Sequence, residues 1–167
     1  RNLTEEIIRK FRIGFAIDSW NGLVNKIGPK YNNETSKLLK TGLFSRSEKG
    51  TVYDRFRSRI IFPISHQSGY VIAFGGRDYN KNDQAKYLNS PETAIYQKSN
   101  VLYGLNVTKS AITNSNNKYI ILVEGYMDLL QLYQAGIEPV VSVSGTSLTK
   151  NHATIVAKYN KPVVILY

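Results

Sequence analysis

The sequence contains no cysteine, only one methionine and one tryptophan, and no long apolar run. The lack of cysteine excludes disulfide bonds and thiolate metal sites. No run approaches the roughly 20 apolar residues that cross a membrane, and residues 1–6 are too polar and charged for a signal peptide. We therefore predict no membrane contact and expect a cytoplasmic protein. Because residue 1 is not methionine, we also expect the sequence to begin inside a longer protein.

Positive charge is in excess and is unevenly distributed. The net charge is +10, and residues 1–117 hold 18 Lys and Arg against 9 Asp and Glu, whereas residues 118–167 hold 4 and 3. A basic surface concentrates polyanions and supports contacts with phosphates. The charge favours a nucleic-acid partner, although a generally basic protein that binds no nucleic acid has the same composition.

The first 117 residues are predicted to form a basic α+β subdomain. Helices are expected after a Thr4 cap, from an Asp18 or Ser19 cap through Trp20 to Ile27, over 34–40 and over 106–115. Residues 59–65 and 70–74 predict two strands of an antiparallel hairpin, which ends at Gly75-Gly76-Arg77. Residues 79–89 are polar and are expected to form a loop.

Residues 118–167 have an α/β pattern. Strands are predicted at 119–123, 139–143 and 162–167, and helices at 127–134 and 149–159. The first strand is continuously apolar, which is typical of a strand buried on both faces. This β-α-β-α-β order predicts a parallel sheet, and ligands of such sheets bind beyond the carboxyl ends of the strands. The fold class is therefore α/β.

Two carboxylates are predicted at that edge of the sheet. Glu124 directly follows the first strand, and Asp128 lies four residues further, in the first turn of the next helix. Gly125 between them permits tight backbone geometry. Carboxylate oxygens suit a hard cation such as Mg²⁺. On spacing alone, a helix cap or a salt-bridge partner is an equally good interpretation of Glu124.

Several basic segments are candidate phosphate contacts. Arg55, Arg57 and Arg59 alternate, so an extended backbone would place them on one face, where they could grip phosphates or pair with acids such as Asp54. Arg77 follows two glycines that we interpret as flexible backbone. Residues 86–90 and 96–98 mix basic and aromatic side chains, which suits single-stranded nucleic acid. The loop 144–147 either admits a phosphate or caps a helix. His66 is expected in a turn and His152 on a helix surface.

Seven segments, in one order, resemble the catalytic core of bacterial, DnaG-type DNA primases over essentially the whole chain. They are Tyr53–Arg57, Ile61–Ile64, Ala73–Arg77, Lys86–Thr93, Leu102–Leu105, Val123–Asp128 and Gly145–Thr149. The resemblance implies that residues 118–167 form the first part of a Toprim module, the metal-binding fold shared with type IA and type II topoisomerases. Glu124 would hold metal or act as an acid or base there, with Asp128 as a supporting carboxylate.

The resemblance also implies the partners. Mg²⁺ or Mn²⁺ would be the cofactor, while zinc would belong to a separate N-terminal module that is absent here. Arg1, Arg77, Lys86 and Lys98 match basic residues around the primase cleft, where they would contact template, nucleotide phosphates or primer, and Arg55, Arg57 and Arg59 would extend that surface. The parent enzyme would make RNA primers from ribonucleoside triphosphates on single-stranded DNA. It would work in the replisome beside a replicative helicase, bound through a C-terminal region absent here. We expect the 167-residue chain to be a monomer.

One departure from the family pattern limits the prediction. The Toprim module also has an Asp-x-Asp pair after its third strand, and this sequence stops at Tyr167, where that strand ends. We therefore expect the chain to carry half of a catalytic site and to be inactive, or nearly so, in isolation. Two alternatives stay open: another Toprim enzyme, such as a nuclease or topoisomerase, and a non-catalytic module that binds single-stranded nucleic acid.

Overall fold

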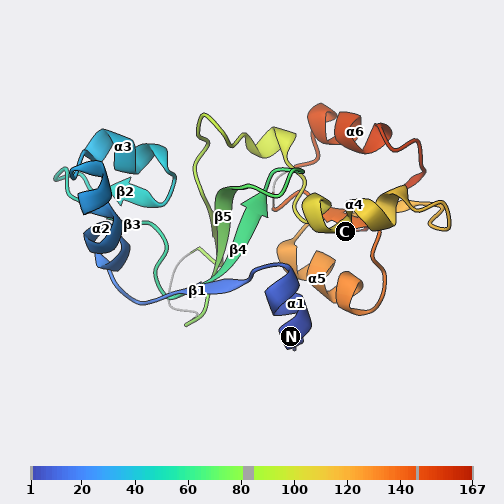
Figure 1. Ribbon diagram of the computed structural model, residues 1–167, viewed down its shortest axis with the longest axis horizontal. Coiled ribbons are helices and arrows are strands. Elements are labelled where there is room, and N and C mark those ends of the chain that lie inside the picture. The colour runs from blue at the N-terminus through green and yellow to red at the C-terminus, as the bar shows by residue number, and fades with distance from the viewer. Residues whose placement is uncertain (1, 81–84, 146, 167) are drawn as a thin grey trace.

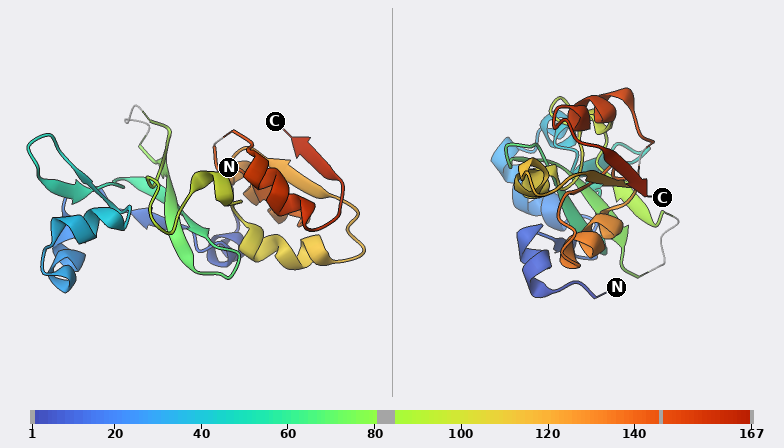
Figure 2. Two further views of the ribbon diagram at one scale, coloured as in Figure 1. Left: turned by 90° about the horizontal axis from the view of Figure 1, so that it is seen from above. Right: turned by 90° about the vertical axis from the view of Figure 1, so that its right-hand side faces the viewer.

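The computed structural model describes residues 2–80, 85–145 and 147–166, which form three regions along the long axis (Figure 1). A small lobe at one end contains α2 (Gly22–Ile27), η1 (Gly28–Tyr31), α3 (Thr35–Lys40) and the hairpin of β2 (Phe44–Arg46) and β3 (Val52–Asp54). An antiparallel sheet occupies the centre, and a parallel sheet with its helices occupies the other end. Figure 2 shows the same separation from above.

The central sheet has the order β1-β4-β5-β6, from β1 (Gly14–Ala16), β4 (Arg59–Ser65), β5 (Val71–Asp78) and β6 (Tyr87–Asn89). The predicted β4–β5 hairpin is confirmed, with Ile64 opposite Ala73. Its predicted end is wrong, because β5 continues through Gly75-Gly76-Arg77. The loop predicted for 79–89 is also wrong at its end, since β6 pairs with β5 there. A strand of three residues is too short to show a clear alternation of side chains.

The N-terminal helices agree with the sequence in part. Thr4 caps α1 (Glu5–Lys10) as predicted, and α3 lies within the predicted range. Helix α2 starts later than predicted, at Gly22, and Trp20 lies outside it. Its cap comes from Asp54, whose two carboxylate oxygens accept hydrogen bonds from the Leu23 and Val24 amides at 2.7 and 2.8 Å. A residue distant in sequence thus takes the place expected for Asp18 or Ser19.

The parallel region confirms the predicted element order and the α/β fold class. It consists of α4 (Leu105–Thr113), β7 (Ile120–Val123), α5 (Tyr126–Gln134), β8 (Val140–Ser142), α6 (Lys150–Ala157) and β9 (Val163–Leu166). The sheet order is β8-β7-β9, and both pairs are parallel. This arrangement puts the loops after β7 and β8 at one edge.

One histidine prediction is wrong in this region. His152 is fully buried, although a position on the helix surface was predicted. It completes a capping box with Thr149 at the start of α6. Its other ring nitrogen, Nε2, lies 2.9 Å from the carbonyl oxygen of Lys98. The hydrogen bonds of both ring nitrogens compensate for their burial. His66, by contrast, is exposed in the β4–β5 turn, as predicted.

The two faces of β7 explain how the regions fit together. Ile120 and Leu122 face a core formed with α4 and α6, whereas Ile121 and Val123 face a core that includes α5, α1 and the central sheet. Phe62 and Tyr126 are both in this second core, one from each predicted domain. The boundary predicted at 117/118 therefore separates two segments that share buried side chains.

Within the described residues, every helix is too short or too polar to cross a membrane.

Candidate active site

The acidic part of the site lies where β7 and β8 end. Glu124 directly follows β7, and its side chain is exposed. Its backbone carbonyl accepts hydrogen bonds from Ser142 Oγ at 3.0 Å and from the Gly145 amide at 2.9 Å. These bonds tie the loop after β7 to the loop after β8. Ser144 and Gly145 have φ values of 60° and 71°, so the second loop turns sharply toward the first.

Asp128 turns back toward the same loop from the first turn of α5. A Cβ atom added at Gly125 would lie 2.8 Å from Asp128 Oδ2, which is closer than such atoms normally approach. The absent side chain at 125 therefore makes room for the Asp128 carboxylate beside Glu124. Both carboxylates thus lie near the edge of the sheet where β7 ends, which is the position that the sequence predicts.

A pocket of about 520 Å³ brings acidic and basic candidates together. Glu124 and Asp128 line it from the parallel region, and the predicted basic residues Arg55, Lys86 and Lys98 line it from outside that region. Among the described residues, no carboxylate lies within salt-bridge distance of these three cations. The pocket thus presents uncompensated positive charge opposite two carboxylates, an arrangement suited to binding phosphates beside a cation.

Arg55 is held in this pocket by neutral groups. Its Nε and Nη2 atoms donate to the carbonyl oxygen of Asn89 at 3.1 and 3.0 Å, and Nη1 donates to Ser45 Oγ at 3.2 Å. Burial lowers the pKa of Arg55, and the charge of Arg59 lowers it as well. A guanidinium nevertheless stays protonated at neutral pH. Arg55 is therefore a half-buried charge without a carboxylate partner among the described residues.

The three alternating arginines do not share one surface. The Arg57 guanidinium lies 3.8 Å from the centre of the Trp20 ring, on the small lobe. Arg59 is 2% exposed, and its Nη1 donates to the Ala85 carbonyl at 3.0 Å. The chain is not regularly extended here, since Ser58 has a φ of 48°. Arg1, another predicted contact, lies outside the described residues.

Asn89 and Tyr126 join the two sides of the pocket, and sequence reasoning missed both. Asn89 Oδ1 accepts from the Tyr126 hydroxyl at 2.8 Å, and Asn89 Nδ2 donates to the Ser144 carbonyl at 3.0 Å. Because its own carbonyl holds Arg55, Asn89 contacts both the basic and the acidic side. Asn89 lies inside the quoted segment Lys86–Thr93, and Tyr126 inside Val123–Asp128, so position in these segments was the available signal.

Tyr126 also fixes the spacing between the sheets. Its ring stacks on Phe62 with centroids 4.9 Å apart and an interplanar angle of 2°. A Cβ atom at Gly75 would lie 2.5 Å from this ring. Burial raises the pKa of the Tyr126 hydroxyl, which keeps it a neutral donor to Asn89. Gly75, which was predicted to be flexible backbone together with Gly76, is thus the packing surface for the buried Tyr126 ring.

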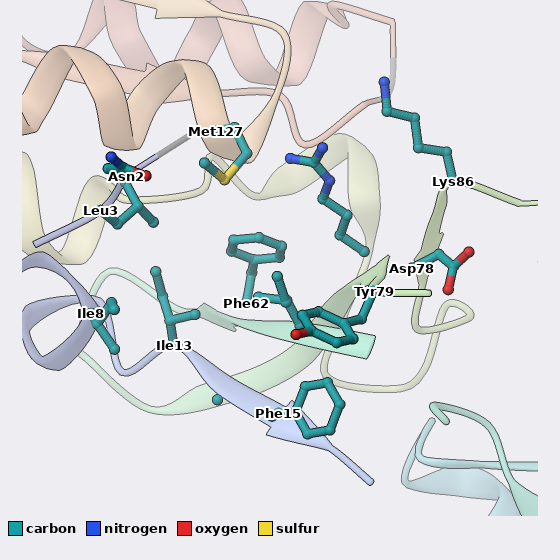
Figure 3. Close-up of a pocket in the computed structure, with 13 residues that line it drawn as sticks. Asn2, Leu3, Ile8, Ile13, Phe15, Phe62, Asp78, Tyr79, Lys86 and Met127 are labelled. Carbon is teal, nitrogen blue, oxygen red and sulfur yellow. The ribbon is translucent and has the colours of Figure 1, made fainter. Parts of the chain in front are cut away.

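A second pocket, of about 1040 Å³, continues from Lys86 (Figure 3). Lys86 lines both pockets, and Arg77 lines this one. Leu3, Ile13, Phe62 and Met127 form an apolar wall opposite Lys86 in the close-up. Apolar surface beside cations suits nucleic acid, whose bases and phosphates need both.

The donor set fits a divalent cation only in part. Glu124 and Asp128 supply hard oxygen ligands, and Mg²⁺ is commonly held by one or two carboxylates together with water and substrate phosphates. No group of three or more His, Asp or Glu side chains that could hold a metal occurs in the described ranges. These two carboxylates are therefore the residues that would hold the cation, with further ligands from outside the described set.

Two family models match successive parts of the chain. Residues 121–167 match the Toprim-like family, and residues 1–109 match the family described as DNA primase catalytic core, N-terminal domain. The chain belongs to the DNA primase family.

Individual DNA primases are similar to this chain over all or nearly all of its length. DNA primases of Legionella pneumophila and Clostridium acetobutylicum are 41% and 44% identical over 167 residues, all of this chain but 28% and 27% of theirs. The Escherichia coli primase catalytic core superposes with a TM-score of 0.89 at 39% identity, over 99% of this chain and 52% of that one. A DnaG primase catalytic domain bound to single-stranded DNA gives 0.87 at 39% identity, over 99% and 52%. The chain thus spans little more than a quarter of its curated relatives.

Proposed function

We propose that this chain is the first part of the polymerising core of a primase, which joins ribonucleotides into short RNA primers on single-stranded DNA. One observation carries the proposal. Cations from the first 117 residues and carboxylates from the Toprim-like part line one pocket, and those cations have no carboxylate partner among the described residues. Membership of the DNA primase family supports the same reaction.

The basic side positions the phosphates. Lys98 and Lys86 are placed to bind the triphosphate or the template backbone, and Arg55 supplies a fixed guanidinium on the same side. The Nε and Nη2 atoms of Arg55 both donate to the Asn89 carbonyl oxygen, and these two bonds restrict the orientation of the guanidinium. A fixed cation loses little conformational entropy when a phosphate arrives, which favours an aligned triphosphate. Arg77 extends the track into the neighbouring pocket.

The acidic side would hold Mg²⁺ or Mn²⁺ through Glu124 and Asp128. Such a cation, when bound, stabilises negative charge on the attacking and leaving oxygens of an in-line phosphoryl displacement. The alternative role for Glu124 is to accept the proton of the attacking hydroxyl instead of holding the cation. The primer would grow on a template that lies along Lys86 and Arg77. A solved relative bound to single-stranded DNA supports this choice of template.

The remaining partners follow from the family. We propose that the full-length gene product works with a replicative helicase in the replisome and that this chain is a monomer. A solved primase of Aquifex aeolicus contains zinc-binding and RNA polymerase domains, which supports zinc in a module separate from this chain.

Primer synthesis tests the proposal directly. The full-length gene product is incubated with single-stranded DNA, ribonucleoside triphosphates and Mg²⁺, and the products are separated by size. We expect short RNA that is lost when the cation is chelated, and no synthesis, or almost none, from the 167-residue chain alone. Robust synthesis by the isolated chain would show that two carboxylates are sufficient.

The same assay separates the alternatives. Cleavage of the DNA without RNA synthesis would indicate another Toprim enzyme. DNA binding with neither activity would indicate a non-catalytic binding module. Either result would overturn the primase proposal for this protein.

A further inference from the structure

A separate pocket of about 500 Å³ lies beside helices α4 and α6, which lie side by side against one face of the parallel sheet (Figures 1 and 2). Its walls come from these two helices, from η2 (Lys98–Asn100) and from the β4–β5 turn. None of the residues that line it lines the catalytic pocket or the pocket of Figure 3. It is therefore separate from the two pockets described above.

The charge of this pocket is of one sign. Lys109 of α4 and Lys158 at the end of α6 line it, and no aspartate or glutamate does. Neither lysine has a salt bridge within the described part of the chain. His66 also lines the pocket, and its Nδ1 lies 2.6 Å from Ser68 Oγ and 3.3 Å from the Ser68 amide. Two ammonium groups without a salt bridge among the described residues favour an anion.

The rest of the lining is apolar and aromatic. Leu102 and Leu105 are almost fully buried and form part of the wall, together with Ile155. The Tyr159 ring also lines the pocket and is half-buried, and burial raises the pKa of its hydroxyl, so it remains a neutral donor. A simple inorganic anion would make no favourable contact with this apolar surface. A volume of this size suits a small organic ligand.

We propose that this pocket binds a nucleotide, with the base against Tyr159 and Ile155, which are partly exposed, and the phosphates at Lys109 and Lys158. A nucleoside phosphate combines a flat aromatic group with a multiply charged tail, which matches the two kinds of lining. The site is separate from the one that holds the polymerised nucleotide.

Helix η2 connects this pocket with the catalytic pocket. Lys98, at one end of η2, lines the catalytic pocket, while Asn100, at the other end, lines the nucleotide pocket. Asn100 Oδ1 accepts from Asn151 Nδ2 at 2.6 Å, and the Ser99 carbonyl accepts from Thr149 Oγ1 at 3.0 Å. A ligand that displaces Asn100 or Asn151 therefore moves the segment that carries Lys98. The regulatory part of the proposal rests on the proposed role of Lys98 in primer synthesis, whereas binding does not.

Binding is tested with ATP in the presence of EDTA and in the Lys86→Ala background, which together remove the cation and one of the lysines that we propose to hold a triphosphate beside Glu124 and Asp128. Calorimetry on the 167-residue protein is expected to show one site. The double variant Lys109→Ala/Lys158→Ala should weaken binding about tenfold or more, since two charge-assisted contacts are lost. Lys150→Ala is the matched control: this lysine is exposed on α6 but does not line the pocket, and affinity should stay within about twofold.

Two further probes identify the ligand class. Adenosine and pyrophosphate should each bind more weakly than ATP, because each satisfies one half of the lining. Pyrophosphate binding as tight as that of ATP would make this a simple anion site and overturn the proposal. Loss of ATP binding in Lys86→Ala, with full binding in the double variant, would place the ligand at the catalytic edge and overturn it as well.

The connection to Lys98 has its own readout. In ¹H–¹⁵N spectra, ATP should shift the amides of 98–100 and 149–152. In Asn151→Ala the shift at Lys98 should shrink while ATP still binds. An unchanged shift at Lys98 would remove the regulatory part and leave the binding site. These measurements need no primer synthesis, so a failure of the primase proposal would not affect them.

Discussion

The two sides of the catalytic pocket differ in charge, in fold and in how their side chains are held. The basic side comes from the first 117 residues, and Arg55 is fixed there by carbonyl and hydroxyl groups. The acidic side comes from loops of the parallel sheet, and Glu124 is exposed on a backbone that two hydrogen bonds tie down. Neither side alone forms the pocket, because one supplies the cations and the other the carboxylates.

The acidic side should control the chemical step alone. Glu124→Gln in the full-length gene product should lower primer synthesis by about 10²–10³-fold, because the charge that holds the cation is lost. Binding of single-stranded DNA should stay within about twofold, since a carboxylate does not attract phosphates. Rates come from primer assays and affinities from fluorescence anisotropy. A variant with wild-type synthesis would make Glu124 structural.

The basic side should control affinity. Lys86→Ala should weaken binding of single-stranded DNA several-fold and reduce the slope of log K against log salt by about 0.7, the value for one phosphate contact on a single strand. Lys30→Ala in η1 serves as the control, because this exposed lysine lines neither pocket. Equal effects from the two variants would show that only overall charge matters.

The connection between the two sides should affect rate more than affinity. Asn89→Ala removes the partner of the Tyr126 hydroxyl and of the Ser144 carbonyl, which costs about 1–3 kcal/mol of unfolding free energy. Arg55 should stay in place, because it is bound to the backbone of residue 89. We expect kcat to fall with little change in KM for the triphosphates. Tyr126→Phe, which leaves the Ser144 contact intact, should show a smaller loss of stability.

Alkaline pH should weaken the core that the central sheet shares with the parallel region, which contains Tyr96, Tyr103 and Tyr126. Burial raises the pKa of Tyr96 to about 12, against 10 in the unfolded chain, and it raises the pKa of Tyr103 and Tyr126 as well. A raised folded-state pKa stabilises the fold fully below pH 10 and less as the pH rises toward 12. Denaturant midpoints should therefore be constant up to about pH 9 and fall above pH 10. A midpoint that is constant through pH 11 would contradict the burial of these hydroxyls.

Long, regular elements were predictable from the sequence because their signal is local. The apolar run of β7 and the strand–helix alternation after Lys118 located the carboxylates correctly. The short strands β1 and β6 escaped prediction, and so did the α2 cap, because Asp54 acts from a distant part of the chain. The shared face expected for Arg55, Arg57 and Arg59 failed for a local reason, the left-handed backbone at Ser58. Asn89 lies inside a segment quoted for the resemblance, but no local pattern indicates its role, because its contacts are formed only in the assembled fold.

The contact between Gly75 and Tyr126 determines a dimension of the molecule. The ring of Tyr126, the first residue of α5, packs against the backbone of β5 at Gly75. Its thickness therefore sets the distance between the central sheet and α5. Because Gly75 pairs with Asn89 of β6, and Asn89 and Tyr126 both line the pocket that holds Glu124 and Asp128, the thickness of the ring also sets the distance between these two walls of the pocket. The width of the pocket is thus determined at a position that has no side chain, and a methyl group added at Gly75 would push the ring away.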